Sequence, residues 1–208
     1  MIRRFFLFSL TMLFAFGVLF LSILRTASIK HQFTAPVTQI NIQEPEFPEI
    51  EYYLPFAGSI LPDNVLWPLK ALRDWTWVYL IREESKKAEI YLLLADKRLV
   101  MTKRLFEKQK YELGVTTLQK AENYLIKSSK MEEVIRTKGG ETKFLSELLA
   151  QASLKHLEII NKLIKQAPED ARPILIEVKK IPQEVYNSKL NYLNTRGYKI
   201  KNNPFDRG

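Results

Sequence analysis

The sequence predicts an all-α protein, with an N-terminal transmembrane helix followed by an antiparallel bundle of about five helices. Three observations support this fold class. Residues 5–24 form an uninterrupted apolar block. The later part of the chain repeats apolar residues at steps of three and four, the spacing of one helix face, without strand-like alternation. Gly and Pro fall between these periodic stretches, where helices are expected to end.

The apolar block is long enough to cross a bilayer. Residues 5–24 contain no charged residue, Asn, Gln or Pro, and as a helix at ~1.5 Å per residue they would span a hydrocarbon core of roughly 30 Å. Arg3 and Arg4 precede the block and Arg25 follows it, so the positive-inside rule favours a cytoplasmic N-terminus by a small margin. We therefore expect residues 1–25 to be a signal anchor in the cell membrane, with the helical domain on the extracytoplasmic side.

A cleaved signal peptide is the alternative for this segment. Thr26-Ala27-Ser28 offers small residues just after Arg25, but a signal peptide usually has a shorter apolar core of roughly 7–15 residues. The length of the block therefore favours an uncleaved anchor.

Residues 26–52 are predicted to be an acidic tether. They contain Pro36, Pro45 and Pro48, and four glutamates gather toward their C-terminal end. Proline-containing, like-charged segments stay extended, so this stretch is expected to hold the domain away from the bilayer. The following residues are richer in apolar and turn residues, and we expect six of them to close one end of the bundle: Tyr53, Phe56, Ile60, Leu61, Leu66 and Trp67.

The bundle domain is expected to occupy residues 53–195, with helices at 65–82, 83–109, 111–137, 141–166 and 169–195. The first of these helices is rich in aromatic residues and apolar on most sides, which favours a central position. Gly139-Gly140 should end the third helix, Pro182 should bend the fifth, and Gly197 should end it. Residues 196–208 are predicted to be a disordered basic tail.

Two helices carry heptad stripes, which favour coiled-coil-like packing between antiparallel neighbours. The stripe of the second helix is Ala88, Leu92, Ala95, Leu99, Thr102 and Phe106. The stripe of the fourth helix is Leu145, Leu149, Ala152, His156, Ile159 and Leu163. The residues expected on the solvated face of the second helix are Lys86, Glu89, Asp96, Lys103 and Glu107.

The charge distribution indicates which surfaces the domain approaches. The net charge of the chain is +9, and residues 64–208 carry 28 Lys and Arg against 18 Asp and Glu. This surplus is compatible with anionic neighbours, such as lipid headgroups, acidic polymers or an acidic protein, but ordinary solubility is the favoured explanation. Nucleic acid is an unlikely partner, because the cations are dispersed among glutamates and no nucleic-acid-binding motif occurs.

The sequence contains no recognisable catalytic or cofactor site. The absence of cysteine excludes disulfides, thiolate metal sites and thiol nucleophiles, and no phosphate-binding or nucleophile-elbow motif occurs. The adjacent acids Glu83-Glu84 and Glu132-Glu133 point to different helix faces and are read as surface residues. We therefore expect no enzyme activity, no catalytic, cofactor-binding or metal-ligating residues, and no cofactor.

His156 is the obvious candidate for a special role. It lies in the apolar stripe of the fourth helix, but position 153 is Ser, so the Glu-x-x-His pattern of a bundle metal site is absent. A core histidine bonded to a neighbouring carboxylate or carbonyl is the favoured interpretation.

A family resemblance covers roughly residues 53–193. Residues 54–70 read LPFAGSILPDNVLWPLK and resemble the opening motif, roughly LPxPGILPDSPLYPLK, of a bacterial helical domain of unknown function that often follows a single membrane anchor. Residues 86–99 resemble that family's KAEL…LAxxRL helix, and residues 167–173 resemble its APEEARP joint. The chain departs from the motif at residues 56–59, so its first turn is expected to be one residue longer. The resemblance implies an envelope-facing bundle, in some members attached to anti-sigma-type regulators, and brings no catalytic residues.

Three functions follow as hypotheses. The first is a membrane-tethered, extracytoplasmic interaction or scaffold module with a protein partner. The second is an electrostatic binding module for anionic envelope components, which are lipid headgroups or acidic polymers. The third and weakest is a hydrolase or metal enzyme.

Overall fold

The computed structural model describes residues 49–198, together with residues 6, 8–12, 14, 17 and 33. Residues 49–198 form five helices and no strand, which confirms the all-α class. The helices are α2 (Trp67–Leu80), α3 (Glu84–Glu107), α4 (Tyr111–Thr137), α5 (Lys143–Gln166) and α6 (Arg172–Thr195). None of the helices in this described part is both long and apolar enough to cross a membrane. Most of the predicted membrane segment, most of the tether and residues 199–208 lie outside the described residues.

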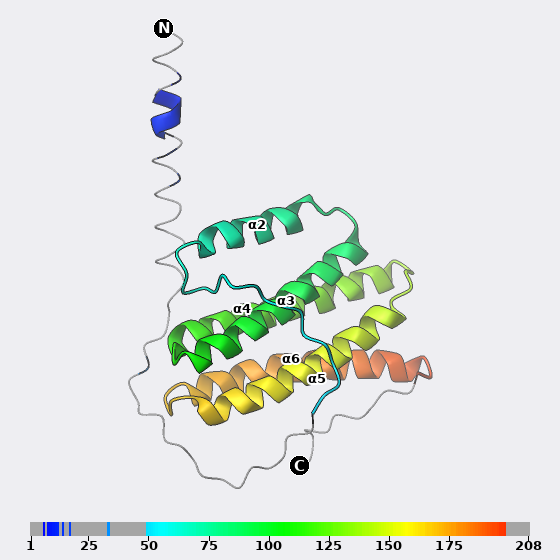
Figure 1. Ribbon diagram of the computed structural model, residues 1–208. Helices are drawn as coiled ribbons and strands as arrows, with labels where there is room; N and C mark the ends of the chain where they lie inside the picture. Colours follow the sequence, from blue (N-terminus) through cyan, green and yellow to red (C-terminus); the bar gives the residue numbers. More distant parts are fainter. Residues whose placement is uncertain are drawn as a thin grey trace.

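The four long helices form two hairpins that pack against each other (Figure 1). α3 pairs most extensively with α4, and α5 with α6, while contacts of α4 with α6 and of α3 with α5 join the hairpins. The turns between helices are short, as expected for antiparallel neighbours. α2 lies outside this bundle and makes its main helix contact with α3.

Both predicted heptad stripes form the core. Every member of the α3 stripe and of the α5 stripe is buried, with an exposed fraction of at most 9%. Leu118, Ala121 and Leu125 of α4 complete the contact between the hairpins. The period of the sequence therefore placed the apolar faces of the bundle correctly.

The α3–α4 turn depends on a close approach at Gly114. A Cβ atom at this position would lie 2.6 Å from two ring carbons of Phe106, which is buried and packs edge-on against Tyr111 at 5.4 Å between ring centroids. We expect Gly114→Ala to lower the free energy of unfolding by about 1–3 kcal/mol, because the added methyl group overpacks this contact. Urea denaturation measures the loss, and adding Phe106→Leu should recover part of it by making room; no recovery would contradict this contact as its cause.

The segment before α2, residues 49–66, is called the lead-in segment here. Its turn is held by side chains that bind backbone carbonyls: Lys70 Nζ donates to Ala57 O at 2.6 Å and Ile60 O at 2.9 Å, and Arg104 Nη1 donates to Gly58 O at 2.9 Å. Gly58 has a φ of 81°, a left-handed conformation that glycine adopts at no steric cost. Lys70, the lysine at the end of the opening motif, therefore fixes the conformation of the turn by binding its backbone carbonyls.

The lead-in segment packs differently from the prediction. Leu61 is buried, but Tyr53, Phe56 and Leu66 are exposed and do not close the end of the bundle. The turn is fixed through its backbone carbonyls, and Phe56 lies on the surface with the Arg104 guanidinium 5.2 Å from its ring centroid. Ile50 and Tyr52, which the sequence assigned to the tether, already pack against the bundle.

The predicted central position of α2 is wrong. Its buried residue is Asp74, whereas Trp75, Trp77, Tyr79 and Leu80 are exposed. The helix is held to the bundle by the ion pair of Asp74 with Arg98 and by Trp67 at its N-terminal end, which packs against Leu61 and Met101. High apolar content was therefore misread as burial, although apolar residues are common on protein surfaces.

Candidate functional site

The centre of the bundle holds a polar cluster of four side chains. His156 of α5 is fully buried, and its Nδ1 lies 2.7 Å from Glu122 Oε1 of α4, while its Nε2 lies 3.1 Å from Asp96 Oδ1 of α3. The Tyr52 hydroxyl donates a hydrogen bond of 2.7 Å to Asp96 Oδ2. The cluster joins three helices and the lead-in segment. The predicted core histidine, bonded to a neighbouring carboxylate or carbonyl, is confirmed, and both partners are carboxylates.

The contacts of His156 define its charge. Both ring nitrogens face carboxylate oxygens, so both must carry hydrogen, which makes the ring an imidazolium. Burial by itself lowers the pKa of His156, but Glu122 and Asp96 outweigh it and raise that pKa to about 10. Burial and then Asp96 raise the pKa of the Tyr52 hydroxyl, which therefore remains a donor.

The geometry of this cluster suits a role in stabilising the fold. The two carboxylates bind opposite edges of one imidazole ring, so the three groups do not converge on a point where a metal ion could sit, and no group of metal-ligating residues occurs in the described part of the chain. The ring nitrogens are occupied and fully buried, so a substrate has no route to them. The cluster therefore acts as an ionic cross-link between α3, α4 and α5.

The imidazolium state gives a pH prediction. Because the pKa of His156 is higher in the folded chain than the ordinary 6.5, its stabilising effect is complete below pH 6.5 and is lost as the pH rises through about 10. We expect the nitrogen NMR shifts of His156 to remain those of an imidazolium at pH 8, and to become neutral at the same pH in urea. A neutral ring at pH 8 in the folded protein would contradict the assignment.

A second buried ionic cluster joins α4 to α6. Lys189 is fully buried, and its Nζ lies 2.6 Å from Glu132 Oε2, 3.1 Å from Glu133 Oε1 and 3.2 Å from Ser129 O. Arg136 approaches Glu132 Oε1 at 3.3 Å. Burial by itself raises the pKa of Glu132, but its hydrogen bond to Lys189 and its other partners outweigh burial, so that the pKa is lowered. The surface position predicted for Glu132 is therefore wrong, while Glu133 is partly exposed as expected.

An open groove of about 540 Å³ runs between the lead-in segment, α3 and α5. Val100, Ile159 and Leu163 supply apolar lining, and the basic side chains along the groove are Lys103, Arg104, Lys155 and Lys162. We call it the lead-in groove.

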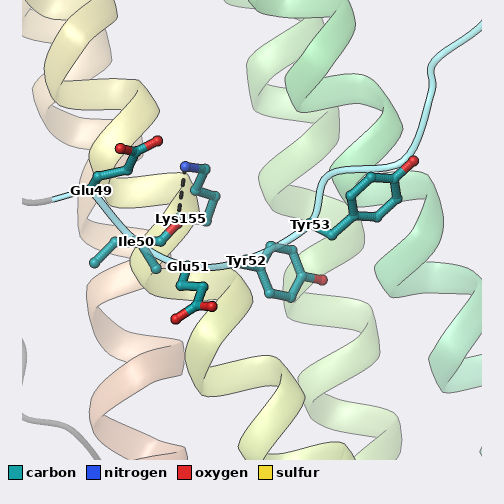
Figure 2. A pocket seen from close by; sticks show the side chains of 6 residues that line it. All are labelled: Glu49, Ile50, Glu51, Tyr52, Tyr53 and Lys155. Atoms are coloured by element: carbon teal, nitrogen blue, oxygen red, sulfur yellow. Dashed lines mark hydrogen bonds between the residues drawn. The ribbon is translucent and has the colours of Figure 1, made fainter.

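One end of the lead-in groove is fixed by Glu158 of α5. Its Oε2 accepts the backbone N–H of Ile50 at 2.9 Å, and Lys155 and Lys162 bind the two carboxylate oxygens at 2.8 and 2.7 Å. Lys155 Nζ also donates to Ile50 O, as Figure 2 shows beside a shallow pocket lined by Tyr52 and Tyr53. Burial raises the pKa of Glu158, but its two lysines outweigh this and lower it. The lead-in backbone is therefore anchored at its N-terminal end.

A smaller groove of about 320 Å³ lies between α2, α3 and α4. Its lining comprises Trp67 and Ala71 of α2, Arg98 of α3, and Lys120, Asn123, Tyr124 and Lys127 of α4. We call it the α2 groove. Arg98 is only 5% exposed and lies between the rings of Trp67 and Tyr124, at 5.0 and 5.3 Å from their centroids. Its Nε and Nη1 atoms have no hydrogen-bond partner among the described residues.

Sequence reasoning found His156 but missed most of its surroundings. Asp96 was expected in solvent because it lies beside the heptad stripe, and Glu122 was not singled out. Both directly follow a buried alanine, Ala95 or Ala121, and flanking positions of a stripe face a second neighbouring helix in a four-helix bundle. An acidic residue at such a position, together with a histidine in a facing stripe, is the signal that could have predicted the cluster.

These features define a class of protein: an antiparallel helical bundle whose hairpins are joined by buried ion pairs, with an exposed aromatic helix along one side. The chain belongs to the family described as a domain of unknown function, DUF5667, whose model matches residues 59–181. The matched region includes Asp96, Glu122 and His156, and ends before Lys189. No curated protein and no solved structure matches the chain.

Proposed function

We propose that the protein is a membrane-tethered interaction module without catalytic activity, whose helical domain lies on the extracytoplasmic side. The apolar block at residues 5–24 supports the anchor, and the arginines before it support the orientation. The family membership is compatible with this function, and the resemblance of the opening motif to membrane-anchored domains supports it further.

The observation that carries the proposal is the lead-in groove. Its apolar lining can accept the side chains of a protein partner, and its four basic residues outnumber the two acidic ones, Glu49 and Glu158. Such a surface suits an acidic amphipathic segment, because rim charges of opposite sign steer association while apolar contacts supply affinity. The partner is therefore expected to present acidic residues beside apolar ones.

Charge reversal in the groove tests this function. Lys103 is exposed and lines the groove, so Lys103→Glu should abolish recovery of a partner cross-linked to the full-length chain in detergent-solubilised membranes. Lys180 is a matched control, because it is an exposed lysine on α6 and does not line the groove. A chain that is recovered alone, or a partner that Lys103→Glu and Lys180→Glu retain equally, would contradict the proposal.

A second candidate function is the binding of anionic envelope components. The α2 groove favours it, because Arg98, Lys120 and Lys127 line it without an acidic residue.

A further inference from the structure

A large exposed apolar surface within residues 49–198 lies on α2 and the residues before it. Its exposed members are Val65, Leu66, Leu69, Leu72, Trp75, Trp77, Tyr79 and Leu80. Figure 1 shows α2 along one side of the bundle, away from the α5–α6 hairpin. Contiguous apolar surfaces of this kind mark interaction sites on soluble domains.

The chemistry of this face is that of a membrane interface. Trp75 and Trp77 are exposed on this face, and Trp75 stacks with Tyr79 at 5.5 Å between ring centroids. Trp67, the third tryptophan of the chain, also belongs to α2 but is half-buried against Leu61 and Met101. Trp and Tyr concentrate at the level of lipid headgroups, where an apolar ring and a polar N–H or O–H are both accommodated. Helices with such a face lie flat in the interface instead of spanning it.

The charges around Lys70 of α2 are predominantly positive. Lys70 has a pKa lowered first by burial, and the cations Arg73, Arg98 and Lys97 lower it further against the opposing effect of Asp74. Asp74 is the acidic member of this group, and it is buried and bound by Arg73 and Arg98. A second copy of the same face would bring like charges together, whereas an anionic bilayer surface complements them.

The α2 groove adds buried hydrogen-bond donors beside the apolar face. Arg98 is 95% buried, as its exposed fraction of 5% implies, and it lines this groove with two nitrogens that lack hydrogen-bond partners among the described residues. Buried donors are ordinarily satisfied, so these two atoms point to a missing acceptor. A phosphate oxygen is a suitable acceptor for a guanidinium, and Lys120 and Lys127 supply further positive charge in the same groove.

We propose that the α2 side of the domain docks on a bilayer that contains anionic phospholipid, with the aromatic face in the interface and a headgroup phosphate in the α2 groove. The inference rests on the proposed membrane anchor. Residues 26–32 connect that anchor to Phe33, which packs against the bundle core and donates its backbone N–H to Glu112 Oε1, and seven residues span at most about 25 Å. Tethering at this range gives a high effective concentration at the bilayer, so docking needs little intrinsic affinity.

The three tryptophans make docking directly measurable, since the intrinsic tryptophan fluorescence of the chain comes from α2 alone. The full-length protein is reconstituted into vesicles of phosphatidylcholine, with or without phosphatidylglycerol, whose acyl chains carry bromine as a quencher. We expect a blue shift and a loss of tryptophan emission in vesicles with phosphatidylglycerol, and much less quenching with phosphatidylcholine alone. Equal emission in brominated and unbrominated vesicles of both compositions would overturn the proposal.

Matched variants on α4 test the groove. Lys127 lines it, and Lys130 is an exposed lysine one turn away that does not. Lys127→Gln should reduce the ratio of docked to undocked domain by about fivefold, the effect of roughly one lost surface charge near an anionic membrane. Lys130→Gln should have a smaller effect, and equal effects of both variants would contradict a headgroup site in the groove.

Other occupants give different results. A second copy would produce a blue shift that depends on protein density and is insensitive to bromine, and this would overturn the proposal. Inorganic phosphate at millimolar concentration is added as a competitor. If it removes the difference in quenching between the unaltered chain and Lys127→Gln while the tryptophans stay quenched, the groove binds free phosphate, and its headgroup role is overturned. Flotation with the vesicles after an alkaline wash tests the anchor separately, so a chain that floats without quenching refutes the docking alone.

Discussion

Replacing His156 with leucine is expected to lower the free energy of unfolding by about 3–5 kcal/mol, the usual cost of removing one partner from a buried charge pair. The substitution leaves Glu122 and Asp96 buried without their common cation, and Glu122 Oε2 already lacks a hydrogen-bond partner in the described structure. Urea denaturation of the detergent-solubilised chain, followed by circular dichroism, measures the change.

Removing the charges together provides the control for this variant. In His156→Leu with Glu122→Leu and Asp96→Asn, no uncompensated carboxylate remains, so much of the stability should return. Gln151→Leu, at an exposed position of the same helix, should change stability by no more than about 0.5 kcal/mol. A single variant as stable as the unaltered chain would show that the cluster is not an ionic cross-link.

Lys189→Met is expected to have an effect of similar size, about 3–5 kcal/mol. Methionine keeps the length of the side chain but removes the ammonium group that binds Glu132, Glu133 and Ser129. Because this group connects α6 to α4, amide hydrogen exchange should increase first in α6. Uniform acceleration across all helices would instead indicate a global loss of stability without a local cause.

Lys180→Met is the matched control on α6. Lys180 is exposed and pairs with the exposed Glu177, and surface pairs of this kind contribute little. Its replacement should therefore leave stability within about 0.5 kcal/mol. Adding Glu132→Gln to Lys189→Met should recover part of the loss, since the buried carboxylate charge is then removed.

The bundle was largely predictable because its helices are long and their apolar periods are regular. α4 has the predicted bounds, since a short turn precedes Tyr111 and a Gly139 with a φ of 82° follows the helix. α5 and α6 begin two or three residues later than predicted, where Thr142 and Ala171 precede them. Local signals at helix ends are therefore sufficient to define the elements of this domain.

The candidate sites were less predictable because they depend on packing between helices. The apolar period of each helix taken alone predicts that Asp96 and Glu132 face solvent. The neighbouring helices bury both residues, and they pair with His156 and Lys189. One of the contacts that position α2 is the ion pair between Asp74 and Arg98, which no hydrophobic pattern encodes. The sequence alone consequently located the core but not its ionic cross-links or its exposed aromatic face.

Protease accessibility tests the central proposal, a membrane-anchored domain outside the cytoplasm, most directly. The full-length chain, with an epitope at its C-terminus, is expressed in cells whose cytoplasmic membrane is exposed to added protease. The proposal predicts loss of the epitope from intact cells, while a short N-terminal fragment that includes residues 5–24 stays with the membrane after an alkaline wash. An epitope that is protected until the cells are lysed would contradict it, and so would a chain that the wash releases.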